Sequence, residues 1–424
     1  MHANGGSGQE TPQERGIGIG YEAMKKAESL LPRTQKNPRV LFVTRSLDRG
    51  GAERQLVTLA VELRRSGWDI AIACFYSGGA FQTELDQAGV PVIDLRKHGR
   101  WDTLGFLWRL LVAYRVFSPD IVHGNMHIAN MLALLARFTR RRTCVVWGVR
   151  SSNVEWQRDN RLMRPTFWLS CKLARYADCI IANSQTGADY HVAYGYPRAR
   201  MVVIPNGIDT GRFHFDPAGR DRLRAEWGIS RNEVLVGVVA RLDPMKDHLT
   251  FLKAAAMLAD RNSHWRFACV GEGPASYTDE LRVQAGEFGL DGRLIFTGAR
   301  DDMSAVYSAF DIACSSSWGE GFPNVVAEAM ACERPCVVTD VGDSARIVAD
   351  CGIVVPAKNP EALAEAIERT WGCTRSAAGR SQLGSASRAR VLREFSANSL
   401  AANSTEILLR ICRDHFTNVP TEAG

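Results

Sequence analysis

Short apolar or β-branched runs alternate with longer stretches of helical spacing from Val40 almost to the end of the 424-residue chain. This alternation is typical of repeated β–α units, whose strands align in parallel sheets covered by helices. A group of turn-forming residues, Pro205-Asn206-Gly207, divides the pattern into an earlier and a later series. The pattern therefore predicts an α/β protein with two domains, each built on a parallel sheet.

The expected strands fall on both sides of this turn. The earlier series comprises Val40–Ser46, Asp69–Tyr76, Val90–Leu95, Asp120–Gly124, Cys144–Val149, Cys179–Asn183 and Met201–Ile204. The later series comprises Val234–Arg241, Arg266–Val270, Leu294–Thr297, Ile312–Ser315, Cys336–Thr339 and Ile353–Val355. We expect residues 1–37 to form a mobile tail with one short helix near Tyr21 to Leu31. The two domains would span residues 38–207 and 208–395, and residues 396–424 would form a helix that packs back toward the first domain.

Composition and charge exclude several classes of protein. The chain is 46% hydrophobic and 23% charged, which excludes wholesale disorder and a disulfide-held miniprotein. A formal net charge of +6 is too small to indicate a nucleic-acid partner, although it suits anionic ligands. The eleven cysteines include no CxxC pair, so we expect reduced thiols without disulfides or a zinc site. With neither a secretory signal pattern nor a run of about 18 apolar residues, a cytoplasmic enzyme is expected.

The strongest candidate site is the segment from Glu320 to Glu328, which follows a predicted strand. Pro323 suits the first position of a helix, and the turn before it can offer backbone N–H groups to an anion or a sugar. Each glutamate can accept two hydroxyl hydrogen bonds, so the two could bracket a sugar or ribose. The structural alternative is that Glu320 is only a charged residue of a loop and that Glu328 only interacts favourably with the positive end of the helix. The segment between them supplies further candidates: Gly321, Phe322, Pro323, Asn324 and Val325.

A second candidate is the loop from Arg241 to Lys246, which follows another predicted strand. A helix is expected to begin near Asp247, an acceptable N-cap residue. The guanidinium and the ammonium at the two ends of this loop could converge on a diphosphate through charge-assisted hydrogen bonds. The alternative is that both are solvated surface cations.

A third candidate, Gly50-Gly51, lies between the first strand and a helix, where small residues let the backbone approach a ligand closely. A plain tight turn is the alternative. The dinucleotide fingerprint GxGxxG is absent after this strand, and HExxH, GxSxG and GxxxxGK[ST] are absent from the whole chain. No Asp-x-Asp pair is present either, so the chain lacks the usual carboxylate ligands for a metal ion that binds a sugar nucleotide. A departing diphosphate would then depend on cations and a helix dipole.

The order of the motifs resembles that of glycosyltransferase family 4, of the GT-B fold. The motifs are, in order, GGAE, IPNGID, the Arg241–Lys246 loop, VGEGP, FTGARDD and two glutamates separated by seven residues. The resemblance covers about residues 38–415. It implies two Rossmann-like domains that face each other across a cleft. It also implies a retaining transfer of a sugar from a nucleotide diphosphate, expected to be a UDP-sugar, to an acceptor hydroxyl. Neither a cofactor nor a metal is expected, and cell-surface polysaccharide, lipopolysaccharide or glycolipid assembly is the expected setting.

The resemblance also implies roles for individual residues. Arg241 and Lys246 would bind the diphosphate, Glu320 and the Gly321–Val325 backbone the donor sugar and phosphate, and Glu328 the ribose. The nucleotide base of the donor would lie near two short stretches of the second domain. Two glycines of the first domain would face the diphosphate. These residues are Gly271, Gly273, Ala299 and Arg300 for the base, and Gly50 and Gly51 for the diphosphate.

One position departs from the family pattern. Many members carry a histidine after the fifth strand of the first domain, where this chain has Arg150. A fixed cation can bind the donor sugar or a leaving group, but it cannot act as a general base. His123 and His127, near the fourth strand, are candidates for the acceptor side, with structural histidines as the alternative.

The segment Phe106–Phe117 is apolar with interspersed arginines, and more arginines follow at residues 137–142. Such a helix can seat a protein on an anionic bilayer, although a helix buried against its sheet is the favoured interpretation. The membrane alternative would place the protein at the inner face of the membrane with a lipid-linked sugar acceptor. Rival functions are a sugar-nucleotide epimerase or hydrolase on the same scaffold, and a nucleotide-sugar-binding protein without catalysis.

Overall fold

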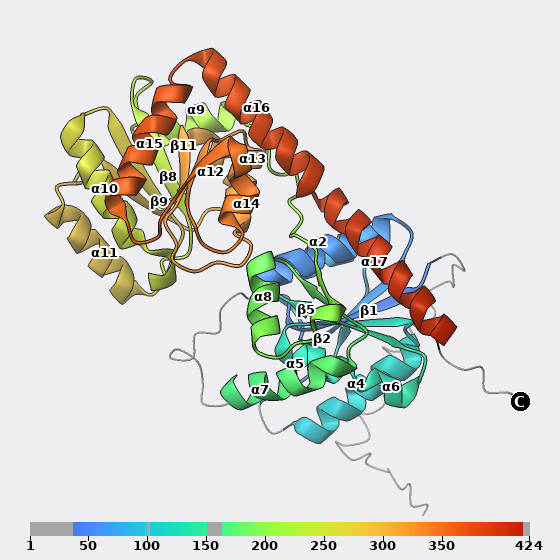
Figure 1. Ribbon diagram of the computed structural model, residues 1–424. Helices are drawn as coiled ribbons and strands as arrows, with labels where there is room; N and C mark the ends of the chain where they lie inside the picture. Colours follow the sequence, from blue (N-terminus) through green and yellow to red (C-terminus); the bar gives the residue numbers. More distant parts are fainter. Residues whose placement is uncertain (1–36, 98, 100–101, 151–162, 419–424) are drawn as a thin grey trace, which may run out of the picture. The chain divides into compact units, whose positions relative to one another are not determined.

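The computed structural model describes residues 37–97, 99, 102–150 and 163–418, and these form two sheets with helices packed against them (Figure 1). The α/β class and the two parallel sheets predicted from the pattern are confirmed. The tail predicted before residue 37, with its short helix near Tyr21 to Leu31, lies outside the described residues.

By their contacts the described residues divide into two compact units. The first contains those of 37–147 together with 176–179 and 407–418, and the second contains those of 148–175 together with 180–406. The domain boundaries predicted at residues 207 and 395 stay a prediction.

The first sheet has seven strands in the order β3-β2-β1-β4-β5-β6-β7. They are β1 (Arg39–Ser46), β2 (Asp69–Tyr76), β3 (Val92–Asp94), β4 (Ile121–Asn125), β5 (Cys144–Val149), β6 (Cys179–Ala182) and β7 (Met201–Val203). β1 pairs in parallel with both β2 and β4, so the strand order reverses there. Open sheets of this kind bind ligands beyond the carboxyl ends of the strands at such a reversal. The Gly50-Gly51 turn follows β1 at this place.

The helices between these strands are α2 (Gly51–Arg65), α3 (Gln82–Gln87), α4 (Thr103–Phe117), α5 (His127–Ala133), α6 (Ala136–Thr139), α7 (Met163–Leu173) and α8 (Gln185–Ala193), with short 3-10 turns η1 (Ala174–Tyr176) and η2 (Arg198–Arg200). α4 is amphipathic. Phe106, Leu110 and Tyr114 are buried, as the favoured interpretation expected, whereas Leu104 and Trp108 are 83% and 58% exposed.

The second sheet has six parallel strands in the order β10-β9-β8-β11-β12-β13. They are β8 (Val234–Val239), β9 (Trp265–Val270), β10 (Leu294–Gly298), β11 (Ile312–Ser315), β12 (Cys336–Thr339) and β13 (Gly352–Val355). The β-branched run of β8 is buried at the centre, where Phe310 packs so closely that a Cβ on Gly237 would lie 2.1 Å from its ring. The order reverses between β8 and β11, which brings the loops after these two strands together.

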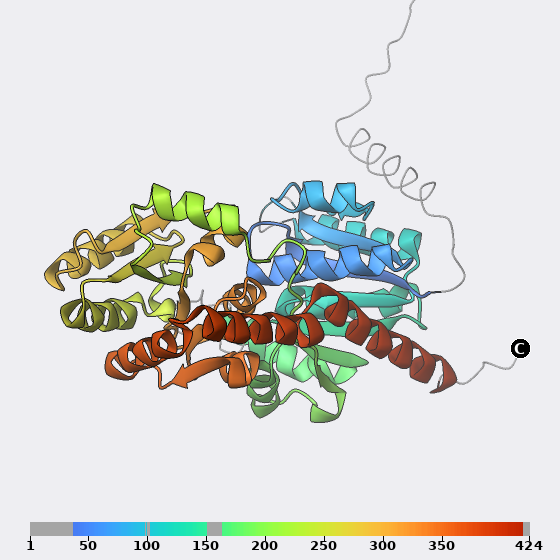
Figure 2. The same ribbon diagram turned by 90° about the horizontal axis from the view of Figure 1, so that it is seen from above.

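The helices that follow β7 in the chain are α9 (Pro217–Glu226), α10 (His248–Arg261), α11 (Ala275–Glu287), α12 (Met303–Ala309), α13 (Asn324–Ala331), α14 (Ser344–Val348), α15 (Pro360–Thr374), α16 (Ala377–Glu394) and α17 (Ala397–Asn418), with 3-10 turns η3 (Pro244–Lys246) and η4 (Ala349–Cys351). Residues 407–418 of α17 belong to the first unit. Two buried apolar clusters flank the sheet. One joins it to α10, α11 and α15, and the other joins it to α9, α12, α13, α14 and α16. α16 leads into α17 with only Phe395 and Ser396 between them (Figure 2).

Several predicted boundaries were off by one or two residues. β8 ends at Val239, so Arg241 lies in the loop and not at the end of the strand. Gly51 is the first residue of α2 and only Gly50 precedes the helix, as its N-cap. Pro323 is the N-cap of α13, and the helix begins at Asn324.

No helix among the described residues is long and apolar enough to cross a membrane. All eleven cysteines lie in the described part of the chain, and none of them is in a disulfide. The expectation of reduced thiols stays a prediction.

Candidate functional site

The loops after β8 and β11 meet through Lys246 and Glu320. The Lys246 Nζ lies 2.6 Å from the Glu320 Oε1, and their side chains are only 17% and 10% exposed. The Ser317 hydroxyl donates to the same carboxylate oxygen at 2.7 Å. The backbone N–H of Trp318 donates to the Met245 carbonyl at 3.0 Å. Two predicted site residues that are 74 positions apart in sequence thus form one shielded ion pair.

Arg241 lies at the other end of the loop after β8, and its side chain is exposed. Asp243 caps η3 by accepting from the Met245 N–H at 2.9 Å, and Asp247 caps α10 by accepting from the Thr250 N–H at 3.2 Å. The helix start predicted near Asp247 is confirmed. The two caps hold the loop in shape, so the structure has a solvent-facing guanidinium at one end and a paired ammonium at the other.

The loop after β12 supports the segment of Glu320 from behind. The Asp343 N–H donates to the Gly321 carbonyl at 2.8 Å. Gly342 has φ +56°, and a Cβ there would lie 2.5 Å from the carbonyl oxygens of both Glu320 and Gly321. Only glycine fits this position, and a substitution would push Glu320 away from Lys246. The sequence interpretation did not identify this support, although Gly342 stands three residues after a predicted strand.

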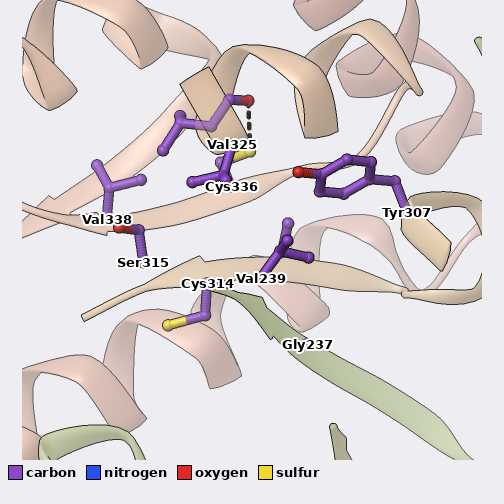
Figure 3. Close-up of a pocket in the computed structure, with 10 residues that line it drawn as sticks. Gly237, Val239, Tyr307, Cys314, Ser315, Val325, Cys336 and Val338 are labelled. Carbon is purple, nitrogen blue, oxygen red and sulfur yellow. Dashed lines mark hydrogen bonds between the residues drawn. The ribbon is translucent and has the colours of Figure 1, made fainter. Parts of the chain in front are cut away.

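Glu328 lies in α13 and accepts a 2.7 Å hydrogen bond from the Tyr307 hydroxyl through its Oε2. Tyr307 is 1% exposed, and burial together with the Glu328 charge raises its pKa well above the ordinary value. Tyr307 also lines a small apolar cavity with Val239, Val325 and other core residues (Figure 3). The structure therefore gives Glu328 a partner that the sequence interpretation missed, and its predicted bond to a ribose stays a prediction.

Phe322 is buried in the core and contacts Phe395 with 5.5 Å between ring centroids. Its side chain is therefore committed to packing, and only its backbone can serve a ligand. Asn324 begins α13, and its Oδ1 accepts from the Asn206 Nδ2 at 2.8 Å.

Arg150 belongs to the same polar chain, because its Nη1 donates to the Asn206 Oδ1 at 3.0 Å. Burial lowers the pKa of Arg150 to about 10, so the guanidinium is still charged at neutral pH. The sequence pattern places Asn206 only in a turn between domains. Its position shows that the turn also links two of the predicted site residues, Arg150 and Asn324.

The two loops that are expected to lie near the nucleotide base, after β9 and after β10, are neighbours. The Gly271 N–H donates to the Gly298 carbonyl at 2.9 Å, next to Ala299. A Cβ on Gly271 would lie 2.0 Å from the Ala240 carbonyl, and one on Gly273 would lie 2.1 Å from the Leu242 carbonyl. Both glycines thus let the loop after β9 pack on the loop after β8.

Arg300 is less available than the sequence indicated. Its guanidinium lies 2.8 Å from an Asp302 oxygen and 2.7 Å from a Glu226 oxygen. Both hydrogen bonds raise the pKa of Arg300, and the one between Arg300 and Asp302 helps to hold the pKa of Asp302 at about 2. A ligand would compete with two carboxylates for this side chain.

The remaining predicted residues lie in the first unit. Gly50 has extended backbone angles (φ −159°, ψ 155°), and a Cβ there would lie 2.2 Å from a Glu53 carboxylate oxygen. His123 is 2% exposed and packs edge-on against Phe42, with ring centroids 5.2 Å apart. This placement favours the structural alternative for His123. His127 begins α5 and is partly exposed, and burial lowers its pKa.

Two family models match separate parts of the chain. The model described as Glycosyltransferase Family 4 matches residues 49–212, and the one described as Glycosyl transferases group 1 matches residues 233–372. Together they cover the Gly50-Gly51 turn, both loops that carry Lys246 and Glu320, and α13.

Named relatives agree with these models. EpsF of Bacillus subtilis (strain 168), named as a glycosyltransferase, is 26% identical over 71% of this chain and 79% of its own length. The D-inositol 3-phosphate glycosyltransferase of Mycobacteroides abscessus is 33% identical over 45% of this chain and 44% of its own. Anabaena Alr3699/HepE, crystallised in complex with UDP-glucose, is 25% identical, with a TM-score of 0.76 over 88% of this chain and all of its own.

Proposed function

Because the chain belongs to the glycosyltransferases of family 4 and has their GT-B fold, we propose that it transfers a sugar from a UDP-sugar to an acceptor hydroxyl with retention and without a metal. The observation that carries the proposal is the shielded Lys246–Glu320 pair where the second sheet reverses its order. The solved complex of the similar Anabaena protein with UDP-glucose supports the choice of the uridine series.

The diphosphate would lie at the second sheet's reversal point, between the loop after β8 and the start of α13. Arg241 offers an exposed guanidinium there, and Lys246 offers an ammonium. The N-terminus of α13 adds backbone N–H groups and a partial positive charge. These groups could stabilise a leaving diphosphate without a metal ion, in keeping with the absence of an Asp-x-Asp pair.

Glu320 would bind hydroxyls of the donor sugar, since a carboxylate accepts two such hydrogen bonds. Arg150 would add a fixed cation that Asn206 links to Asn324. In the transfer step, the bond between the anomeric carbon and the diphosphate oxygen breaks, and a bond to the acceptor oxygen forms on the same face. The acceptor proton passes to the departing diphosphate, since Arg150 cannot serve as the base.

The acceptor we propose is a sugar or a lipid-linked sugar in surface polysaccharide or glycolipid assembly, reached from the cytoplasmic side of the membrane. Leu104 and Trp108 lie one turn apart on the exposed side of α4, which contacts α6, where Phe138 is 84% exposed. Two exposed arginines, Arg141 and Arg142, follow α6. Apolar side chains next to cations are suited to the surface of an anionic bilayer.

The chain is therefore expected to float with anionic liposomes in low salt and to remain at the bottom of the gradient with neutral ones. Replacing both Leu104 and Trp108 with serine should weaken flotation strongly, because it removes two of the three exposed apolar side chains named for this face. The control replaces Val283, which is 62% exposed on α11 in the other unit, with serine. Equal flotation of all three proteins would remove the case for membrane contact.

The donor proposal is tested by thermal shift and turnover. UDP-, GDP- and ADP-sugars are each added to the wild type and to Lys246→Ala, with EDTA or with Mg²⁺, and the rise in Tm over the same buffer without donor is measured. One UDP-sugar should raise the Tm of the wild type equally in both buffers and leave Lys246→Ala unchanged. Donor turnover to UDP should then rise several-fold when an acceptor is added. A rise in Tm that occurs only with Mg²⁺ would contradict the proposal. So would donor turnover that is the same with and without an acceptor.

A further inference from the structure

Four potential metal ligands from three distant segments converge at one end of the first sheet. Cys144 is the first residue of β5, Asp178 stands directly before β6, and Cys412 and His415 lie on α17. The Cys144 Sγ, an Asp178 oxygen and a His415 ring nitrogen all lie within 4.8 Å of one another. The Cys412 thiol is a neighbour of the Cys144 thiol, and together with burial it raises the pKa of Cys144. The group belongs entirely to the first unit.

We propose that Cys144, Asp178 and His415, with Cys412 as the fourth ligand, form a zinc site that clamps the end of α17 onto β5 and β6. Thiolate, imidazole and carboxylate are the ligands that zinc takes in proteins, usually four in a tetrahedron. Around such an ion the ligand atoms lie roughly 3.3–3.8 Å apart, from bond lengths of about 2.0–2.3 Å. The three atoms that lie within 4.8 Å of one another would draw closer by side-chain rotation, and the Cys412 thiol, which lies outside that group, would turn toward them.

The two oxygens of Asp178 have different surroundings. Oδ2 accepts from the Arg137 guanidinium and from the Val145 N–H, both at 2.7 Å. Oδ1 is the oxygen that faces His415, whose Nδ1 lies 3.5 Å away. Arg137 and Val145 therefore orient the carboxylate in the manner of outer-shell partners, while its other oxygen is directed at the cluster.

The ligands on α17 are three residues apart, so they share one face of the helix. The two thiols are buried, at 0% exposure for Cys144 and 4% for Cys412, whereas the side chains of Asp178 and His415 are 18% and 16% exposed. The site thus has a protected sulfur side and an open side through which an ion can enter. A sequence search for CxxC pairs could not find it, because its ligands are separated by up to 271 positions.

This site is structural and separate from the donor site. It lies where β5 and β6 begin, whereas the ligand crevices of parallel sheets lie beyond the ends where the strands finish. Loss of the ion should therefore loosen α17 and lower the Tm without removing the donor-induced shift. Zinc binding by these ligands is independent of the proposed transfer reaction.

The test uses the full chain, stripped with a chelator and kept reduced with a phosphine, so that no thiol oxidation contributes. Zinc is titrated in competition with a chromophoric chelator, and Co²⁺ is added in parallel as a spectroscopic substitute. One ion per chain should bind, zinc should raise the Tm, and Co²⁺ should show a thiolate charge-transfer band with visible bands of tetrahedral coordination. A chain that binds no ion tighter than the competing chelator does would overturn the proposal.

Two ligand variants and one control identify the residues. Cys144→Ser and His415→Ala should each lower zinc affinity at least about tenfold and abolish the zinc-induced rise in Tm. His415 is partly exposed, so its variant should fold even if the buried Cys144→Ser does not. Cys373→Ser changes an exposed thiol elsewhere and should bind zinc like the wild type. Unchanged affinity in His415→Ala, or equal loss in Cys373→Ser, would contradict the assignment.

Discussion

Replacing Lys246 with alanine is expected to lower kcat/KM for the donor by about 10²–10³-fold, the range found when one preorganised electrostatic donor is removed from an active site. The ammonium pairs with Glu320 at 2.6 Å and would stabilise negative charge on the leaving diphosphate. Its removal also leaves the Glu320 carboxylate, which is only 10% exposed, without its cation. The measurement is initial-rate kinetics with varied donor.

Lys253→Ala is the matched control, because Lys253 is an exposed lysine on α10. This helix begins two residues after Lys246. It should keep kcat/KM within about twofold of the wild type, as surface substitutions usually do. A fall in kcat would assign Lys246 to the transition state, and a rise in KM alone would assign it to donor binding. Kinetics of Lys246→Ala equal to those of the control would refute any role in the reaction.

A double-mutant cycle with Glu320→Gln separates the ion pair from direct contact with the donor. If Lys246 served only to hold Glu320, the double variant would be no slower than Glu320→Gln alone. If both side chains also contact the donor, the double variant should be slower than Glu320→Gln alone, and the free-energy losses should depart from additivity by about 0.5–3 kcal/mol because the two side chains touch each other.

Replacing Asp311 with alanine is expected to destabilise the second unit by about 3–5 kcal/mol, the cost of breaking a buried ion pair. Asp311 is 4% exposed and lies 2.6 Å from the Arg220 guanidinium and 3.0 Å from that of Arg224. It also accepts from the Leu235 N–H at 2.9 Å, which ties the start of β11 to β8. The variant would leave both guanidinium groups without this carboxylate, so its Tm should fall by about 10 °C.

The pH dependence of this network has a definite sign. Burial alone would raise the pKa of Asp311, but the charges of Arg220 and Arg224 and the Leu235 hydrogen bond lower it below its ordinary value. A carboxylate with a lowered pKa contributes stability above its unfolded pKa of about 3.9 and loses it as the pH falls further. Asp311→Ala should therefore differ most from the wild type above about pH 4.

The control is Glu368→Ala, which removes an exposed ion pair with Arg261. The side chain of Glu368 is 50% exposed and that of Arg261 is 45% exposed. Exposed pairs contribute about 0–1 kcal/mol, so the Tm should hardly change. A fall in Tm no larger for Asp311→Ala than for this control would show that the network is not important for stability.

The local pattern of the chain was enough to predict its elements. The alternation of β-branched runs with helical spacing located the strands to within two residues, because side-chain period and backbone geometry are coupled within one element. Turn chemistry identified the segment before α13 and the helix start at Asp247, since N-caps and prolines act through neighbouring backbone groups. Family-like order among these motifs then indicated a glycosyltransferase.

Contacts between distant segments depended on the order of the strands, which no local pattern contains. Lys246 meets Glu320 because β8 lies beside β11 in the sheet, and Tyr307 reaches Glu328 because α12 and α13 pack on the same face. The same holds for Arg150 with Asn206, and for Cys144 with Asp178 and His415. Sequence alone determined which side chains could do chemistry. Only the tertiary structure decided which of them face one another, because packing and sheet order set the distances between residues far apart in the chain.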